Sequence, residues 1–464
     1  DYRKKPLHSS FYILTTMHPR LIKQDNILKE LKLSMSNNIT INIPILARVE
    51  GEGALELEIR NNTIKLLKLR IYEPPRLFEK FLEGRHYTEV MDFVARICGI
   101  CPVAYQMSAG HAIENCFGIT PSPWIREMRR LFYCGEWLES HSIHIHLLAL
   151  PDFLGFKSVI EMAKSYPEAV RRGLRLQAFG NELIKLFGGR SVHPVGACVG
   201  GFYKAPNLAD INMILIKAKE MAKDCEELID WLSTISLPDN SHDFTSVSLY
   251  HPTEYPINEG NIVSNHGLNI SIAEFDNHFK EFQVSYSNAL HCMLNNKPYL
   301  VGPLARINNC FGHLPTSIHV FLQNLKINFP TTNMYYSIIA RSVEMYYCTL
   351  EAIRILQEYK YPHHSHVEVK PKAGQGFGCT EAPRGMLWHH YQLDDNGQVK
   401  SARIIPPTSQ NQARIEEDLR ISLFKFGLNN EEEKLRAYSE MIIRNYDPCI
   451  SCSTHFLNLK VSRQ

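Results

Sequence analysis

The chain has 464 residues, of which 44% are hydrophobic and 21% are charged, a composition typical of a globular protein with a large core. The formal net charge of +2 gives no reason to expect nucleic acid or an anionic membrane surface as a partner. No apolar run reaches the roughly 18 residues of a transmembrane helix, so no membrane span is predicted.

The first 34 residues are basic and show no periodic pattern. Met35 is predicted to be the true start, which makes residues 1–34 an upstream extension. A flexible N-terminal arm is the alternative. Residues 35–455 are predicted to form a single domain.

Residues 39–72 are predicted to be β structure, because Ile39, Ile41 and Ile43 alternate with polar residues and a second alternating run follows. The charged turn Arg48–Gly53, taken alone, is typical of a solvated loop. After it the pattern becomes helical. Helices are predicted around residues 77–82, from about residue 88 to the first cysteine pair, and over 103–118 and 123–150.

The helix over 123–150 carries three histidines, His141, His144 and His146. Histidine clusters can ligate metal, but His146 points away from the face that the other two share. Packing or support of a nearby site is therefore favoured over direct ligation.

Further along the chain, helices alternate with two β regions. A small irregular β insertion is predicted over 237–272, and a β-rich segment over 366–405 with a hairpin turn at Asp394–Gly397. Helices are predicted over 158–187, 208–236, 273–295, 315–327, 334–359, 411–426 and 431–444. The expected fold class is mainly α with small β regions, that is, α+β.

Two C-x-x-C pairs lie 348 residues apart (449 − 101): Cys98 with Cys101, and Cys449 with Cys452. Two intervening residues let both sulfurs of a pair turn toward one point, which suits a soft metal. Structural zinc, an iron–sulfur cluster, a catalytic metal site and two thioredoxin-like redox pairs are all possible readings. The long separation disfavours a compact zinc ribbon, and the charged flanks Arg96, Asp447 and His455 favour catalysis.

The twelve cysteines are too few for a disulfide-rich protein of this length. Thiols in a reducing cytoplasm are expected, with a disulfide scaffold as the alternative. The eight cysteines outside the two pairs are isolated in the sequence and are interpreted as packing residues.

The motif Arg96–Cys101 together with Asp447–His455 resembles the paired signature of the large subunit of [NiFe] hydrogenases. Three more motifs match in order: Arg48–Gly51, Gly189–Pro194 and Glu381–Gly385. The resemblance covers nearly all of residues 39–455. The motifs are most similar to those of the cytoplasmic, bidirectional branch of the family, which couples to NAD(P) and includes sulfhydrogenases. The resemblance implies a long helical bundle core with an N-terminal β-hairpin region.

The resemblance implies that Cys98 and Cys449 are terminal nickel ligands, and that Cys101 and Cys452 bridge nickel to an iron carrying CO and cyanide. Arg384 would lie over the open side of the metals and act in splitting H2. Thr408 would donate a hydrogen bond to a cyanide. Pro383, in the motif Glu381–Gly385, would also lie in the surroundings of the iron-bound CO and cyanide. Catalytic roles are thus expected for Arg384, for Cys449, and for Glu50 as the first proton acceptor.

The resemblance also implies a structural magnesium bound by Glu79 and His455. No remaining cysteines have iron–sulfur spacing, so an iron–sulfur small subunit is expected as partner, with diaphorase or NAD(P)-binding subunits beyond it. Residues 456–464 would be removed by a maturation endopeptidase, because the family is cut after the histidine of the last motif.

One departure from the family pattern is Tyr105, which stands where many relatives have histidine four residues after the second cysteine. Two alternatives stay open on sequence grounds. One is a quinone-site subunit of respiratory complex I, which shares the fold but lacks the metal cysteines; the other is a structural zinc protein.

Overall fold

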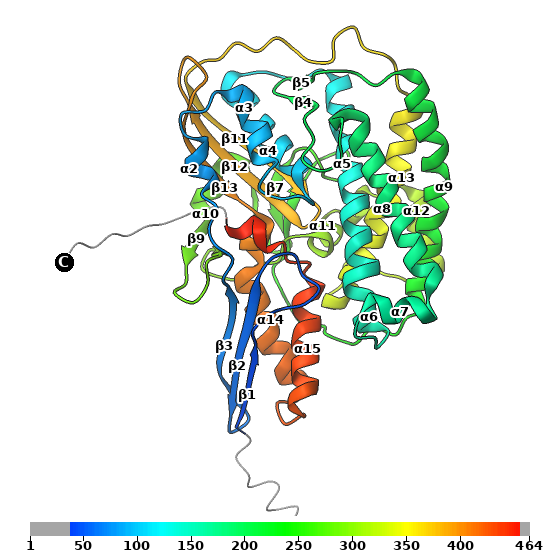
Figure 1. The fold of residues 1–464 in the computed structure, drawn as a ribbon, viewed down its shortest axis with the longest axis vertical. Coiled ribbons are helices and arrows are strands. Elements are labelled where there is room, and N and C mark those ends of the chain that lie inside the picture. Colours follow the sequence, from blue (N-terminus) through cyan, green and yellow to red (C-terminus); the bar gives the residue numbers. More distant parts are fainter. Residues whose placement is uncertain (1–37, 455–464) are drawn as a thin grey trace, which may run out of the picture.

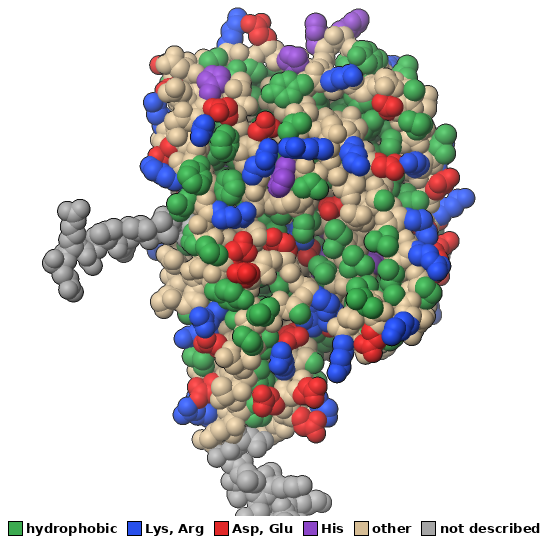
Figure 2. Space-filling model, viewed as in Figure 1, with side chains coloured by type: hydrophobic (Ala, Val, Ile, Leu, Met, Phe, Trp, Pro, Cys, Tyr) green, Lys and Arg blue, Asp and Glu red, His purple; other side chains and the backbone are tan. Residues whose placement is uncertain are grey.

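The computed structural model describes residues 38–454. The predicted extension over 1–34, His455 and the tail over 456–464 therefore lie outside the described residues. Within residues 38–454, five small antiparallel sheets accompany a larger number of helices, which confirms the predicted α+β class. None of the helices in the described part is both long and apolar enough to cross a membrane. Figure 2 shows Lys and Arg interspersed with Asp and Glu over one face, in keeping with the balanced net charge.

A block of long helices forms one side of the molecule (Figure 1). Within it α5 packs against α8 and α13, and α13 packs against α9. These helices begin where the sequence supplies caps: the Ser122 side chain accepts from Ile125 N, and Asn207 accepts from Asp210 N. The bounds are α5 Pro123–Ile143, α8 Pro167–Gly188, α9 Leu208–Ser233 and α13 Ser337–Gln357, with α7 Val159–Ser165 and α12 Thr316–Asn324 alongside.

The N-terminal sheet agrees with the prediction. Strands β1 (Ile39–Ile43), β2 (Gly53–Arg60) and β3 (Thr63–Ile71) pair antiparallel in that order. Asn61 and Asn62 both have positive φ and make the turn between β2 and β3. The alternating apolar residues of β1 and β2 are buried, which fixes the register of the sheet.

Two helix predictions were wrong. The segment predicted as a helix over 273–295 is the short helix α10 (Phe275–His278) followed by a hairpin of β9 (Phe279–Gln283) and β10 (Leu290–Leu294). Phe279 and Leu294 pair across this hairpin and are both buried, so cross-strand packing overrode the apparent helical spacing. The helix predicted over 158–187 is divided, because Pro167 can begin α8 but cannot continue α7. Helix α11 (Pro303–Cys310) was not predicted.

A second sheet lies directly on α4 (Pro102–Phe117). It contains β11 (Gly374–Ala382), β12 (Gly385–Leu393) and β13 (Val399–Ile405), which includes the predicted hairpin. Glycines let β11 approach the helix closely: a Cβ on Gly376 would lie 2.0 Å from Ala112 O, and one on Gly378 would lie 2.2 Å from Ser108 O. The turn after β11 is thereby brought toward the N-terminal end of α4, where the first cysteine pair lies.

The C-terminal helices return the chain to the middle of the molecule. Helices α14 (Pro407–Phe426) and α15 (Glu432–Asn445) lead to the short helix η5 (Ile450–Thr454), drawn in red at the centre of Figure 1. The end of the described chain is joined to the N-terminal region by backbone hydrogen bonds, from Ile450 N to Glu50 O and from Arg76 N to Thr454 O. The two cysteine pairs are therefore brought together by the fold, with α2 (Phe78–Leu82) and α3 (Tyr87–Val94) preceding the first.

Candidate metal centre

All four motif cysteines converge on one point, as the sequence predicts. Their sulfurs lie within 4.8 Å of one another, and they are the one group of metal-ligating side chains found in the part of the chain that the structure describes. The Sγ–Sγ distances are 3.3 Å for Cys98–Cys449, 3.5 Å for Cys101–Cys452 and 2.9 Å for Cys449–Cys452. Each cysteine is at most 4% exposed, so water is largely excluded from the sulfurs.

Local backbone geometry positions the first pair. Cys101 immediately precedes α4, and Pro102 occupies the first helical position, where a missing N–H costs nothing. The backbone N–H groups of Ile100 and Cys101 point at Cys98 Sγ, at 3.3 and 3.4 Å. These donors favour a thiolate, which is the form that binds metal.

A side chain from the N-terminal region joins the two cysteine segments. Arg76 Nη2 donates to Ile97 O at 2.7 Å and also to Ser451 O. One guanidinium thus holds the backbone beside both pairs.

Glu50 lies against the second pair. Its Oε2 is 3.2 Å from Cys449 Sγ and accepts from Ser451 N at 3.0 Å, while its Oε1 accepts from the Ser451 hydroxyl. Burial and the nearby Cys98 raise the pKa of Glu50, and the hydrogen bonds from Ser451 and Cys449 oppose that rise. The turn that looked like a solvated loop in isolation is therefore part of the site.

Arg384 lies in the turn between β11 and β12 and is 4% exposed. Its Nε donates to Asp447 O at 2.8 Å and its Nη2 donates to Asp447 Oδ1 at 3.0 Å. Its buried Nη1 has no hydrogen-bond partner among the described residues. Burial lowers the pKa of Arg384, but Asp447 and the neighbouring cysteines more than offset this and hold its pKa above the ordinary value.

The other predicted residues lie around this centre. Thr408, in the first turn of α14, accepts from Cys449 N through Oγ1 at 3.1 Å. Pro383 directly precedes Arg384, and its carbonyl accepts from Arg306 Nη2 at 3.0 Å. Glu79 lies on α2 and accepts from Ile404 N at 2.7 Å, while its predicted partner His455 lies outside the described residues.

The structure adds three residues that motif spacing did not assign. Asp447 fixes Arg384 from the residue two before Cys449. Glu139 lies near Arg384 and Cys98, and burial raises its pKa to about 8 although Arg384 opposes the shift. Tyr105 is fully buried at the cysteines, and burial together with Cys452 and Cys101 raises its pKa well above the ordinary value. A charged flank beside a cysteine was the available signal for Asp447, and the departure from the family pattern drew attention to Tyr105, whereas a single Glu on a helix gives no signal.

The histidines and the isolated cysteines play other parts. His141 bonds Glu344, His144 bonds Arg444 O and His146 bonds Ser142 O, so within residues 38–454 none joins the metal-ligating group and the packing interpretation holds. All twelve cysteines lie in the described range and are free thiols, which excludes the disulfide scaffold there.

The residues present fit a soft transition-metal centre. Four buried thiols form a compact donor set, and softness matches nickel and low-valent iron as well as zinc. A structural zinc site would need neither a buried guanidinium nor a carboxylate 3.2 Å from a ligand sulfur. Fold and site together indicate a catalytic metal centre, held between the segments 98–101 and 449–452 of one chain.

Comparison with known proteins identifies the family. The family described as nickel-dependent hydrogenase matches residues 76–172 and 239–455. The alpha subunit of sulfhydrogenase 1 from Pyrococcus furiosus is 32% identical over 91% of this chain and 99% of that protein. The beta subunit of the NAD-reducing hydrogenase HoxS from Cupriavidus necator is 27% identical over 91% of this chain and 96% of that protein.

A solved structure of an NAD+-reducing [NiFe]-hydrogenase in the H2-reduced state has the same fold, with a TM-score of 0.82, 26% identity, and coverage of 90% of this chain and 99% of that one. The chain belongs to the nickel-dependent hydrogenase family, as a large subunit and an oxidoreductase acting on H2. The four-cysteine site is accordingly assigned to nickel and iron.

Proposed function

We propose that this chain cleaves H2 heterolytically and reversibly at the four-cysteine centre, with Arg384 and Glu50 handling charge and proton. The observation that carries the proposal is that the guanidinium of Arg384, fixed by Asp447, and the carboxylate of Glu50 both lie beside the same buried set of thiols. Nickel and iron bound there, the iron carrying CO and cyanide, would supply the redox chemistry that polarises H2 and accepts its electrons.

The cysteines divide into two roles. Cys98 and Cys449 are proposed as terminal nickel ligands, and Cys101 and Cys452 as the bridging ligands to iron. This division follows the family resemblance, and each proposed pair takes one sulfur from each motif, at Sγ–Sγ distances of 3.3 Å for Cys98–Cys449 and 3.5 Å for Cys101–Cys452. Thr408 is proposed to face a cyanide: its oxygen already accepts from Cys449 N, which leaves its hydroxyl proton to donate.

Arg384 supplies a permanent positive charge in a dry environment. Asp447 occupies its Nε and Nη2, which fixes the orientation of the plane and leaves Nη1 as the available donor. A guanidinium held in this way can orient and polarise H2 without reorganisation at the moment of reaction.

Glu50 takes the proton from the Cys449 sulfur. Glu50 Oε2 is 3.2 Å from Cys449 Sγ, and the raised pKa of Glu50 lets its carboxylate hold a proton more readily than an exposed carboxylate would. The Ser451 hydroxyl and N–H hold the carboxylate in place during the transfer.

Electrons must leave through another protein, because the four cysteines are the one metal-ligating cluster within residues 38–454. An iron–sulfur small subunit is the proposed partner. Exposed Gly99 lies between the two cysteines of the first pair and next to exposed Val192, so this part of the surface is where that subunit is proposed to bind.

The wider assembly is proposed from the similarity to two of the relatives. One relative is named a sulfhydrogenase and another an NAD-reducing hydrogenase, so NAD(P)+ or polysulfide is the proposed electron acceptor, with ferredoxin as a further candidate. Diaphorase or NAD(P)-binding subunits and a cytoplasmic location belong to the same proposal. A magnesium ion bound by Glu79 and His455 is also proposed. It is supported by the bond from Arg76 N to Thr454 O, which brings the residue before His455 close to α2. Removal of residues 456–464 by a maturation endopeptidase completes the proposal, with 35–455 as the mature domain.

The test is metal analysis and infrared spectroscopy of the purified complex. About one nickel and one iron per chain, with bands from CO and cyanide, are expected together with H2-dependent reduction of an added dye. Zinc as the sole metal, with no H2 uptake, would contradict the proposal.

A further inference from the structure

Arg306, a fully buried arginine on α11, reaches the turn that carries Arg384. Its Nη1 donates to Ala382 O at 2.7 Å and its Nη2 donates to Pro383 O at 3.0 Å. These are the two peptide carbonyls immediately before Arg384. The guanidinium of Arg306 is therefore hydrogen-bonded to the backbone that carries Arg384.

Hydrogen bonds to carboxylates fix the guanidinium of Arg306 in turn. Its Nε and Nη2 donate to the two oxygens of Glu344 at 2.8 Å each, and its Nη1 donates to Glu381 Oε2 at 2.9 Å. With the two carbonyls, all five N–H groups of the guanidinium have acceptors, which is the maximum an arginine can make. The ring of Trp137 covers one face, with its centroid 4.2 Å from the guanidinium carbon.

The carboxylates that hold Arg306 are held in turn by other elements. Glu344 accepts from Tyr255 OH at 2.7 Å and bonds His141 Nε2 at 2.8 Å, while Glu381 accepts from Leu249 N at 2.7 Å. Arg306, Glu344 and Glu381 all have side chains that are 0% exposed. A charge group buried this deeply without gaps is rigid, because any movement leaves a charge unpaired in a dry interior.

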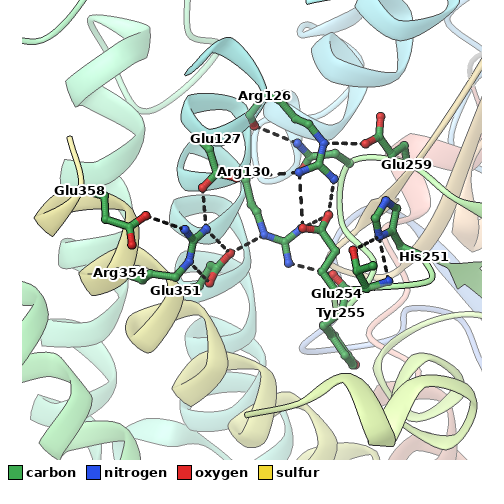
Figure 3. Close-up of polar contacts among 12 residues, drawn as sticks. Arg126, Glu127, Arg130, His251, Glu254, Tyr255, Glu259, Glu351, Arg354 and Glu358 are labelled. Carbon is green, nitrogen blue, oxygen red and sulfur yellow. Dashed lines mark hydrogen bonds and ion pairs between the residues drawn. The ribbon is translucent and has the colours of Figure 1, made fainter. Parts of the chain in front are cut away.

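The same group connects to an ion-pair network nearer the surface, drawn in Figure 3. Arg130 Nη2 donates to Tyr255 O at 2.8 Å, and its other nitrogens pair with Glu254 and Glu351. The loop that carries Tyr255 is thus fixed at its carbonyl by Arg130 and at its hydroxyl by Glu344. Helices α5 and α13 therefore support the turn between β11 and β12, called here the arginine turn, which carries Arg384.

We propose that Arg306 is the positioning residue of the reaction: it acts through Arg384 by fixing the peptide planes of Ala382 and Pro383. This rests on the proposed role of Arg384 at the metals. Rotation of either carbonyl would swing the Cα–Cβ direction of Arg384 and carry Nη1 away from its place. Lysine at 306 keeps the charge, but three N–H groups in place of five cannot serve both carboxylate partners and both carbonyls.

The test is a double-mutant cycle in the holoenzyme complex: Arg306→Lys, Arg384→Lys and the double variant. Arg306→Lys is expected to lower kcat for H2 oxidation roughly 10- to 100-fold, the usual cost of a misplaced reacting group. Nickel and iron content should be unchanged. In the Arg384→Lys background the same change should cost less than about twofold, because the group being positioned has already been altered.

Arg129→Lys is the matched control. Arg129 is also buried and makes a bidentate pair with a carboxylate, Glu114, at 2.8 and 2.6 Å; its further hydrogen bond goes to Cys198 O, away from the turn that carries Arg384. It should leave kcat unchanged in both backgrounds. Equal losses for Arg129→Lys and Arg306→Lys would mean that any buried pair matters equally and would overturn the assignment.

The outcomes separate this inference from the proposed function. Normal turnover of Arg384→Lys would refute the role of Arg384. Slow turnover of Arg384→Lys with normal turnover of Arg306→Lys, or with losses that multiply in the double variant, would refute the role of Arg306 alone.

Hydrogen exchange gives a readout independent of activity. In the metal-free chain, Arg306→Lys should speed amide exchange in the peptide covering 381–386 and leave α9 unchanged. Faster exchange throughout the protein, or an unchanged exchange rate in the peptide covering 381–386, would overturn the positioning role. This measurement decides the matter even for a variant that retains no metal.

Discussion

Glu50 is the residue whose proposed role is easiest to isolate. Glu50→Gln keeps the size and an acceptor oxygen for Ser451 but cannot take up a proton, so H2 oxidation should fall roughly 10²-fold or more. Nickel and iron should stay bound, since no ligand is removed. The measurement is H2-dependent dye reduction together with exchange between D2 and solvent protons.

The matched control for Glu50→Gln is Glu52→Gln, two residues away and exposed. It should be as active as the parent. If Glu50→Gln exchanges D2 with solvent protons at the parental rate, protons leave by another path.

His141 gives the buried network a dependence on pH. Burial lowers the pKa of His141 to about 4 from 6.5, although its hydrogen bond to Glu344 opposes the shift. Between pH 6.5 and about pH 4, the His141 imidazole is protonated in the unfolded chain but stays neutral in the folded chain. The free energy of unfolding therefore falls as the pH falls through this window. The largest loss from this group is about 3 kcal/mol, reached near the lower value.

His141→Gln should therefore flatten the fall in melting temperature between pH 7 and pH 5, measured by thermal unfolding. Glu344 does not affect this comparison. Burial raises its pKa, but Arg306 outweighs burial, and the pKa of Glu344 falls to about 2 from 4.5. The loss of stability from Glu344 therefore begins only below about pH 4.5. His364→Gln, at an exposed position, should leave the slope as it was. An unchanged slope in His141→Gln would show that other groups control acid stability.

At the scale of single elements, the contact between β11 and α4 depends on missing side chains. A Cβ on Gly378 would lie 2.2 Å from the backbone oxygen of Ser108, so strand and helix would have to move apart. Gly378→Ala should lower stability by about 1–3 kcal/mol, as overpacking usually does, and shift the turn that presents Arg384.

Thermal unfolding of Gly378→Ala checks this, with Gly312→Ala as control, because a Cβ on Gly312 would meet nothing within 4 Å. Parental stability in Gly378→Ala would show that the sheet can retreat from α4 without cost.

Elements with a strict period were predictable, and elements decided by long-range partners were not. The alternation in β1 and β2 is a local signal, and the strands predicted from it were confirmed. The hairpin of β9 and β10 failed because its pairing depends on burial between distant elements. The same limit applies within the site: the cysteines have a recognisable spacing, whereas Arg306 is one arginine in α11 whose partners lie 38 and 75 residues away.

At the scale of the whole molecule, the two ends of the described chain form one unit. Arg76 is the residue that spans them, through Ile97 O and Ser451 O. Arg76→Gln should let the Cys449–Cys452 segment separate from the first pair and lose nickel faster when a chelator is added, with helix content unchanged by circular dichroism.

Arg85→Gln is the control, because Arg85 is exposed and its side chain contacts Glu89 and Phe93 and no cysteine segment. Retention of nickel in Arg76→Gln at the parental rate would show that Glu50 and the backbone bonds suffice to hold the ends together.

The joining of distant ends also sets a time order for the cell. Half of the ligands, Cys98 and Cys101, are synthesised early, yet the centre needs Cys449 and Cys452, which come 348 residues later (449 − 101). Chains emerge N-terminus first, so a ribosome-bound chain still short of residue 452 has helices and sheets to fold but no complete metal cage. The complete set of four cysteines therefore becomes available only once residue 452 has been synthesised, after every helix and sheet that precedes it.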